Sequence, residues 1–507
     1  MIRDSELERY LECISTSLST SIRPAIEAGP ALKTVDSLNL VLGRLLGELK
    51  NGSTVVDANM TAWRKLAESC PVGDAQSTDI TVSWRPMIAL DTQVSEIQHN
   101  IEDPKNFETL ISQIRNRNPD AMSWIQESAD ILNRTLQQSE DGFFHPEIGE
   151  AKPEDRVIDA TALKRRIGTY LSERFPELPS DCVETLKIVP GGQVKLTAIF
   201  QLIENDVLPR RLVLRQDQEF NITGAVITDE YEVLKKIAPL GLPFPEAVLL
   251  ETDATKLDGQ FLLMKEFENT EAAGTYFVEE RRLLGSTMGP SFGDDVARVL
   301  AGLHRGTEVA SGSEESDDSE AAIIAGMEID WRGQGRSSFS IAIALCLAWL
   351  KANPLSENRP RAMIHGDMGA HNMLTRDGRL AALLDWELAR YGDPAEDLAQ
   401  TRMMLLPDTM PWPEFKAAYL RHGGSPEACD ERAVAYFAVR TFLKHGLMNM
   451  RMWEYFITGQ RADAPAASIA SHFIERLMLY LARTLKMAIE AETQDAPQSA
   501  ELLEART

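Results

Sequence analysis

The spacing of apolar residues changes twice along this chain of 507 residues. In the first 145 residues, apolar side chains recur every three or four positions, which is the period of a helix with one buried face. The three clearest stripes are Val35, Leu38, Val41, Leu42, Leu45, Leu46 and Leu49; Phe107, Leu110, Ile111 and Ile114; and Met122, Ile125, Ala129 and Leu132. Residues 1–145 therefore predict a helical accessory domain without a catalytic motif, for which we expect a role in packing, dimerisation or partner binding.

A polar linker at 137–155 precedes a region in which short apolar runs are typical of strands. Strands are expected at 183–189, 194–203, 211–215 and 260–266, and helices at 161–175 and 228–237. After Gly274 the helical period returns, most clearly at 413–420, 432–450 and 469–489. The pattern predicts an α+β chain with a small antiparallel β lobe at 155–267, a helical lobe at 268–490 and a polar tail at 491–507.

The candidate chemistry lies at 363–402, in the motif His365-Gly366-Asp367, the amide Asn372 and the segment that begins with Asp385. Two apolar runs between Asn372 and Asp385 flank an Asp-Gly pair, which predicts a hairpin that returns Asp385 toward Asp367. Carboxylate and amide oxygens are the ligands that Mg²⁺ prefers, and a carboxylate on a tight loop accepts a proton from a hydroxyl. Each short motif alone is better explained as an ordinary turn or strand end.

His-Gly-Asp, four residues, Asn, a hairpin and then Asp-Trp-Glu resemble the catalytic segment of the aminoglycoside phosphotransferase and choline kinase superfamily, whose fold is bilobal and protein-kinase-like. The resemblance covers about residues 155–485. It implies that Asp367 is the catalytic base, that Asn372 and Asp385 bind Mg²⁺, that ATP is the phosphate donor and that His365 supports the loop. His371 is expected to point away from the site. Protein kinases carry a lysine two residues after the base, where this chain has glycine, so a small-molecule hydroxyl is the expected acceptor.

The resemblance also implies a nucleotide site in the β lobe. The predicted residues are Gly191, Gly192, Arg215, Glu230, Glu266 and Phe267. Glycines in the turn at 190–193 let backbone N–H groups approach phosphate oxygens. Arg215 stands where most kinases have a lysine, and Glu230 is its expected partner, whereas Glu232 is expected to be exposed. Glu266 and Phe267 fall at the hinge that binds adenine through backbone groups. If the family resemblance is set aside, the glycines at 190–193 are explained by a plain hairpin turn and Arg215 by a solvated arginine at a strand end.

The composition of the chain argues against some classes of binding partner. The formal net charge of −25 argues against binding of nucleic acid or an anionic membrane, because both require basic surface. The first residues are polar and acidic, and no apolar run approaches the roughly 20 residues of a membrane span, so a cytoplasmic protein is expected. Five scattered cysteines without a CxxC pair are typical of reduced thiols.

The arrangement of motifs is similar to that of bacterial phosphotransferases found near acyl-CoA dehydrogenases. This favours an ATP- and Mg²⁺-dependent kinase that phosphorylates a hydroxylated catabolic metabolite. Two alternatives stay open: an aminoglycoside-type antibiotic kinase, which the acidic composition would suit, and a catalytically inactive kinase-fold scaffold. The retention of Asp367, Asn372 and Asp385 argues against the scaffold, because an inactive site has no physical need for all three.

Overall fold

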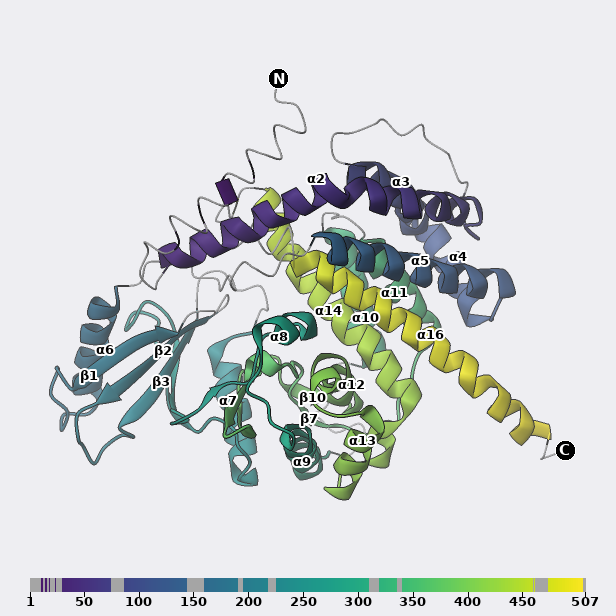
Figure 1. Cartoon of the computed structure of the whole chain (residues 1–507). Coiled ribbons are helices and arrows are strands. Elements are labelled where there is room, and N and C mark those ends of the chain that lie inside the picture. The colour runs from purple at the N-terminus through teal and green to yellow at the C-terminus, as the bar shows by residue number, and fades with distance from the viewer. Residues whose placement is uncertain are drawn as a thin grey trace. The chain divides into compact units, whose positions relative to one another are not determined.

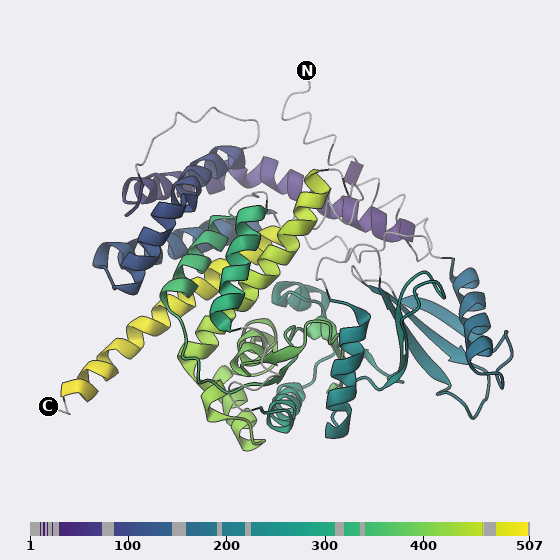
Figure 2. The same ribbon diagram turned by 180° about the vertical axis from the view of Figure 1, so that it is seen from behind.

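The computed structural model describes residues 30–73, 86–143, 159–189, 195–217, 225–309, 319–334, 340–458 and 473–504, together with Leu11, Ile14, Ser15, Leu18, Arg23 and Gln460. Figures 1 and 2 show the helices and strands from opposite sides. The predicted α+β class is confirmed, because a helical N-terminal part is followed by an antiparallel sheet and then by a largely helical region.

The chain forms two compact units. Unit 1 contains Met1–Ala151, Asp318–Glu357 and Glu431–Thr507, and unit 2 contains Lys152–Asp317 and Asn358–Asp430. The domain boundaries expected at 145, 155, 267 and 490 stay a prediction, because they divide the chain by sequence pattern whereas the units divide it by packing.

Unit 2 begins with helix α6 and a five-stranded antiparallel sheet in the order β1-β2-β3-β5-β4. The elements are α6 (Ala160–Arg174), β1 (Val183–Val189), β2 (Lys195–Leu202), β3 (Arg211–Asp217), α7 (Ile227–Ile237), η3 (Ala238–Leu240), β4 (Ala247–Glu251) and β5 (Phe261–Lys265). The predicted strand 183–189 is confirmed, and each of the other predicted elements in this region is found within two residues of its expected bounds.

Alternation along the strands gives the sheet two apolar faces with different helices on them. Helix α6 packs on the face that carries Ala198, Phe200 and Leu214. Helix α7 packs with Leu262 and Met264 on the opposite face. Side chains that must reach a site beside α7 therefore have to come from the second face.

The rest of unit 2 surrounds the predicted catalytic stretch. Its elements are β6 (Glu271–Ala272), α8 (Val278–Leu284), α9 (Phe292–Gly306), β7 (Ala362–Ile364), η4 (Ala370–Asn372), β8 (Met373–Arg376), β9 (Arg379–Leu383), β10 (Arg390–Gly392), α12 (Ala395–Met404), η5 (Leu406–Asp408), α13 (Trp412–Arg421) and η6 (Pro426–Cys429). The predicted hairpin is confirmed as β8–β9. Asp377 and Gly378 form its two-residue turn with φ of 53° and 73°, a geometry that matches the twist of the strands.

Unit 1 consists of helices within the part of the chain that the structure describes. They are α2 (Pro30–Glu68), α3 (Pro86–Glu102), α4 (Pro104–Arg115), α5 (Pro119–Phe143), α10 (Glu320–Gly333), α11 (Ile341–Ala352), α14 (Glu431–Ile457) and α16 (Ile474–Glu504). The stripe predicted at 107–114 is buried on α4, which starts at the N-cap Asp103. Two ion pairs join α16 to its neighbours, Arg44 with Glu475 and Arg476 with Glu140. No helix in the described ranges has the length and apolar character needed to cross a bilayer.

Candidate functional site

The loop between β7 and η4 holds the His-Gly-Asp motif in a fixed shape. Gly366 has φ of 76°, and a Cβ at this position would lie 2.6 Å from the carbonyl oxygen of Leu388, so the turn requires glycine. The fully buried carboxylate of Asp397, on α12, accepts hydrogen bonds from the backbone N–H groups of His365 at 2.8 Å and Gly366 at 2.9 Å. Nε2 of His304 donates to the same carboxylate at 3.1 Å. Asp397 therefore braces this loop.

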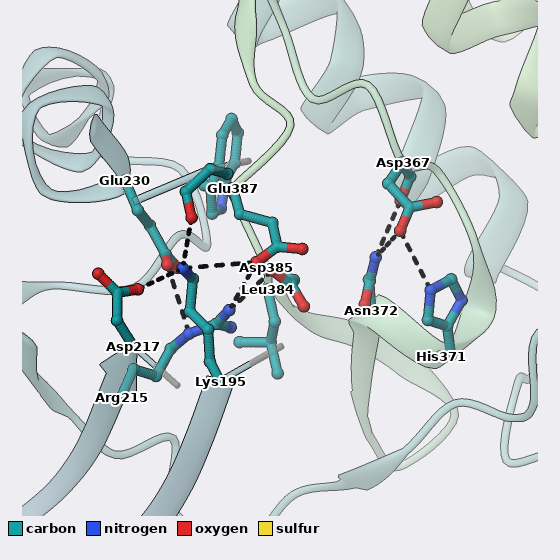
Figure 3. Close-up of polar contacts among 12 residues, drawn as sticks. Lys195, Arg215, Asp217, Glu230, Asp367, His371, Asn372, Leu384, Asp385 and Glu387 are labelled. Carbon is teal, nitrogen blue, oxygen red and sulfur yellow. Dashed lines mark hydrogen bonds and ion pairs between the residues drawn. The ribbon is translucent and has the colours of Figure 1, made fainter. Parts of the chain in front are cut away.

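Asp367 receives hydrogen bonds on both carboxylate oxygens. Gln400 of α12 donates its Nε2 to Oδ1 at 2.9 Å. Asn372 Nδ2 donates to Oδ2 at 2.8 Å, and His371 Nε2 donates to the same oxygen at 3.2 Å. The expectation that His371 points away is wrong, because the short helix η4 brings residue 371 back over residue 367, as Figure 3 shows. Its ring also lies 4.9 Å from that of Tyr276, centroid to centroid.

Hydrogen bonds join the β8–β9 hairpin to this loop. His365 accepts the backbone N–H of Asp367 on Nδ1 at 3.2 Å and donates from Nε2 to the carbonyl of Leu384 at 2.8 Å. The N–H of Leu384 donates to the carbonyl of Asn372, also at 2.8 Å. Asp385 follows Leu384 directly, and its backbone has the left-handed conformation, with φ of 65°. One network of hydrogen bonds thus brings Asp367, Asn372 and Asp385 into a single region.

Arg215 connects the sheet to Asp385. Its Nη2 donates to Asp385 Oδ1 at 2.8 Å, and its Nε lies 3.4 Å from Glu230 Oε2 on α7. The expected pairing of Arg215 with Glu230 is therefore confirmed, and Glu232 is exposed as predicted. Burial alone would lower the pKa of Arg215, but the charges of Asp385 and Glu230 outweigh burial and raise it. Burial raises the pKa of Glu230, and the attraction of Arg215 offsets this only in part.

A second cation, Lys195, lies beside this pair. Its Nζ donates to Asp217 Oδ1 at 2.8 Å and lies 3.8 Å from Glu387 Oε2, which is also 3.8 Å from Arg215 Nη2. Burial, together with the charge of Asp385, raises the pKa of Glu387 to about 8. Two cations and four carboxylates, drawn together in Figure 3, meet here. Burial is the main cause of both raised carboxyl pKa values, and a bound cation would lower them.

The remaining predicted residues lie elsewhere in the β lobe. Gly191 and Gly192 fall outside the described residues. Glu266 and Phe267 follow β5, as the hinge prediction requires. The carboxylate of Glu266 pairs with Arg211 Nε at 2.5 Å, and its backbone N–H donates to the Arg211 carbonyl at 3.2 Å. The polar groups of Glu266 are thus engaged by the neighbouring strand.

Comparison with known proteins places this region in a family. Residues 198–436 match the model of the phosphotransferase enzyme family, and that range contains Arg215, Asp367, Asn372 and Asp385. This segment belongs to the phosphotransferase enzyme family. The predicted resemblance is confirmed.

Similar proteins extend the comparison. Acyl-CoA dehydrogenase family member 11 of Mus musculus is 22% identical over 306 residues, which are 58% of this chain and 37% of that protein. The chain therefore spans less than two fifths of this relative's length. A putative aminoglycoside phosphotransferase from Ralstonia eutropha JMP134 has a TM-score of 0.46 at 15% identity, covering 63% of this chain and 97% of that one. The GDP complex of aminoglycoside 2'-phosphotransferase-IIIa has a TM-score of 0.42 at 13% identity, covering 64% and 98%.

The side chains of Asn372 and Asp385 have oxygens of the kind that Mg²⁺ binds. The Nδ2 group of Asn372 donates to the backbone carbonyl of Asp367 at 3.1 Å and to the Asp367 carboxylate at 2.8 Å. The amide oxygen Oδ1 of Asn372 is therefore directed away from Asp367. The carboxylate of Asp385 is one-third exposed. Among the described residues, no cluster of three or more His, Cys, Asp or Glu side chains has the arrangement of a metal site. Mg²⁺ in nucleotide enzymes commonly takes one or two protein oxygens, and phosphate and water complete its shell.

Sequence reasoning missed several residues of this candidate site. Lys195 is the single charged residue of β2, which is otherwise mostly apolar, and this isolated charge could have indicated a functional role. Gln400 is three residues after Asp397 and therefore on the same side of α12, which could have indicated that both face the loop. The contact of His371 with Asp367 depends on the place of His371 in the 3₁₀ turn Ala370–Asn372 and had no equivalent signal in the sequence.

Asp397→Asn is expected to lower the free energy of unfolding of the protein by about 2–4 kcal/mol at pH 7, because it removes a buried charge that binds three donors. Burial alone would raise the pKa of Asp397, but the hydrogen bond and charge of His304 outweigh it and hold this pKa below the usual value. The stabilisation is therefore complete above the unfolded-state pKa of about 4 and is lost as the pH falls through the folded-state value.

Urea unfolding of wild type and variant between pH 8 and pH 3.5 measures this difference. The gap should be constant from pH 8 to pH 5 and should narrow below about pH 4. Asp377→Asn, at an exposed turn position that tolerates asparagine, is the matched control. Equal stability of Asp397→Asn and wild type at pH 7 would contradict the bracing role.

Proposed function

We propose that this phosphotransferase transfers the γ-phosphoryl group of ATP to a hydroxyl group of a small molecule, with Mg²⁺ as cofactor. The observation that carries the proposal is the hydrogen bond between Asn372 and Asp367, with Asp385 held nearby through the backbone bond from Leu384 to Asn372 and paired with Arg215. These groups provide a base, oxygen ligands for a metal and a cation for phosphate. Phosphoryl transfer requires mainly such positioning and neutralisation of charge.

Asp367 acts as the base in this mechanism. The acceptor hydroxyl donates its proton to the Asp367 carboxylate as its oxygen attacks the γ-phosphorus, and the bond from that phosphorus to the β–γ bridging oxygen breaks, which releases ADP. Gln400, Asn372 and His371 hold the carboxylate in one orientation through the hydrogen bonds described above. A fixed carboxylate places the hydroxyl for in-line attack without first reorganising the loop.

The β lobe holds the nucleotide in this proposal. Arg215 binds the α- and β-phosphates after leaving Asp385, and Glu230 keeps the guanidinium in place. Gly191 and Gly192 are proposed to approach the phosphates through their backbone, and the segment of Glu266 and Phe267 to bind adenine. Because the N–H of Glu266 is bonded to Arg211, Phe267 is the better candidate for the backbone contact. Asn372 and Asp385 would hold Mg²⁺, which would neutralise part of the phosphate charge.

The acceptor is proposed to be a hydroxylated catabolic metabolite. The names of the similar mouse proteins, acyl-CoA dehydrogenase family members 11 and 10, support this class of acceptor. A polycationic aminoglycoside is the second candidate, which the net charge of −25 favours because acidic clefts concentrate cations. A non-catalytic scaffold is the third, and the roles of the N-terminal helices in dimerisation or partner binding stay a prediction.

A thermal-shift titration of the full chain tests the reaction class first. Mg²⁺-ATP is expected to raise Tm in proportion to the logarithm of its concentration above Kd, because a ligand that binds only the folded state stabilises it. No stabilisation together with no ATP hydrolysis would favour the scaffold. A phosphorylation screen against neutral, anionic and polycationic alcohols then identifies the acceptor class.

The screen is run at two ionic strengths. Turnover of the metabolite class should change little with salt, because its binding does not depend on exposed charges that are screened over about 8 Å at physiological ionic strength. Turnover confined to polycations, with a steep decrease at high salt, would instead establish the antibiotic kinase.

A further inference from the structure

Lys195 is a buried lysine whose three contacts reach three different elements. Its Nζ donates to Asp217 Oδ1 on β3 at 2.8 Å and to the carbonyl of Ala225, just before α7, at 3.1 Å. The third neighbour is Glu387 Oε2, at 3.8 Å, two residues after Asp385. Only 3% of Lys195 is exposed. Placing an ammonium group in the interior is costly unless it has such partners, so this arrangement needs an explanation.

Strand register places Lys195 on the same face of the sheet as Arg215. Lys195 is directly opposite Asp217, and Thr197 is directly opposite Arg215. Residues two apart on a strand share a face, and directly paired residues project to the same side. Figure 3 shows both cations projecting toward Asp385 and Glu387. Lys195 therefore faces the proposed nucleotide site, although it lies two residues closer to the turn at 190–193 than Thr197, the residue paired with Arg215.

The partner of Lys195 also fixes the start of helix α7. The second oxygen of Asp217, Oδ2, accepts the backbone N–H of Ile227 at 3.1 Å. The N-cap residue of α7, Val226, has no side chain that could make this bond. Asp217 therefore caps the helix from the neighbouring strand, while Lys195 binds the carbonyl of Ala225 on the same turn. Together the two side chains attach the N-terminus of α7 to β2 and β3.

Helix α7 carries Glu230 one turn later, and Glu230 is the partner of Arg215. We propose that Lys195 is a positioning residue of the nucleotide site, which fixes α7 and the Asp-Trp-Glu segment relative to β3 and so places Arg215, Glu230 and Asp385 for a Mg²⁺-nucleotide. This inference rests on the proposed function. It assigns to Lys195 an effect on nucleotide affinity that acts through Arg215 and Asp385, without direct contact with phosphate.

Loss of the lysine charge would disturb all three elements together. Methionine has a similar length but no donor, so Asp217, Glu387 and the Ala225 carbonyl would lose a common partner. Asp217 would then be drawn toward other donors, and the cap on α7 would loosen. Arginine would keep the charge, but its planar fork cannot reproduce the three directions of an ammonium group. The effect should therefore be largest for methionine and smaller for arginine.

The test measures Mg²⁺-ADP binding by calorimetry on the full chain, so that it needs no acceptor. Lys195→Met should weaken Mg²⁺-ADP binding by about 10- to 100-fold, the range typical of residues that orient metal ligands. Lys195→Arg should recover part of this loss. Lys187→Met, which removes an exposed lysine from β1 of the same sheet, should bind as the wild type does.

The outcomes separate the inference from the function on which it rests. Wild-type Mg²⁺-ADP affinity in Lys195→Met, with or without a lower Tm, would leave Lys195 a purely structural residue and overturn the inference. If Lys195→Met does not fold, Lys195→Gln, which keeps two donors but no charge, replaces it and must show the same weakening. A wild-type protein that fails to bind Mg²⁺-ADP would overturn the proposed function itself.

Discussion

Asp367→Asn should reduce the rate of phosphoryl transfer by about 10²- to 10⁴-fold, the contribution expected of a positioned general base. Asparagine keeps the size of the side chain and one acceptor oxygen for Gln400 or Asn372, whose amides donate to Asp367. It cannot accept the proton of the attacking hydroxyl. The loss should therefore fall mainly on kcat, with the KM for ATP and the free energy of unfolding little changed. Steady-state kinetics with the acceptor found by the screen measures both constants.

The control for this substitution is Asp377→Asn, the same chemical change in the turn of the β8–β9 hairpin. It should retain wild-type kinetics. Turnover in Asp367→Asn within a factor of a few of the wild type would remove Asp367 from the role of base. A matching loss of ATP binding would instead point to damage of the loop.

Asp385→Asn is expected to abolish the Mg²⁺ dependence of nucleotide binding. The substitution removes the only carboxylate of the proposed two-residue metal site, and a neutral amide oxygen is a much weaker partner for Mg²⁺. Asparagine is preferable to alanine here, because Asp385 has φ of 65°, a conformation that asparagine adopts more readily than most residues. We expect Mg²⁺-ADP affinity to fall by about 100-fold or more, a larger effect than the 10- to 100-fold typical of residues that only orient metal ligands. Metal-free ADP affinity should change much less.

A matched control is Asp258→Asn. Asp258 has nearly the same φ, 66°, but its carboxylate is highly exposed and pairs with Arg166 at the surface. It should leave both affinities unchanged. Calorimetry with ADP in the presence of Mg²⁺ and of a chelator gives the two values for each variant. Equal Mg²⁺ dependence in Asp385→Asn and wild type would exclude Asp385 as a ligand.

Local patterns in the sequence predicted those parts of the site that depend on neighbours along the chain. The hairpin followed from an Asp-Gly pair between two apolar runs, because this pair suits a turn with two positive φ angles. The pairing of Arg215 with Glu230 followed from the resemblance to the family, which supplied the tertiary information.

Contacts made by isolated side chains could not be predicted in the same way. Lys195 meets Asp217 because β2 and β3 pair in one register, and a shift of one residue would place the lysine on the face covered by α6. His371 reaches Asp367, four residues earlier, because it lies in the short 3₁₀ turn Ala370–Asn372. Register and turn type are set by the whole fold, and the residue types alone leave them open.

Helix α11 has a consequence for any attempt to isolate the catalytic part of this chain. All of its residues except Lys351 are buried, and the helices packed against it include α3 and α4 from the N-terminal third as well as α14 and α16. A fragment beginning near residue 155 would keep α11 but lose α3 and α4, which would expose an apolar surface. Such a fragment should aggregate, so inactivity after this truncation would report lost cover over α11 and carry no information about catalysis. The helices of unit 1 are therefore studied more safely by point substitution than by deletion.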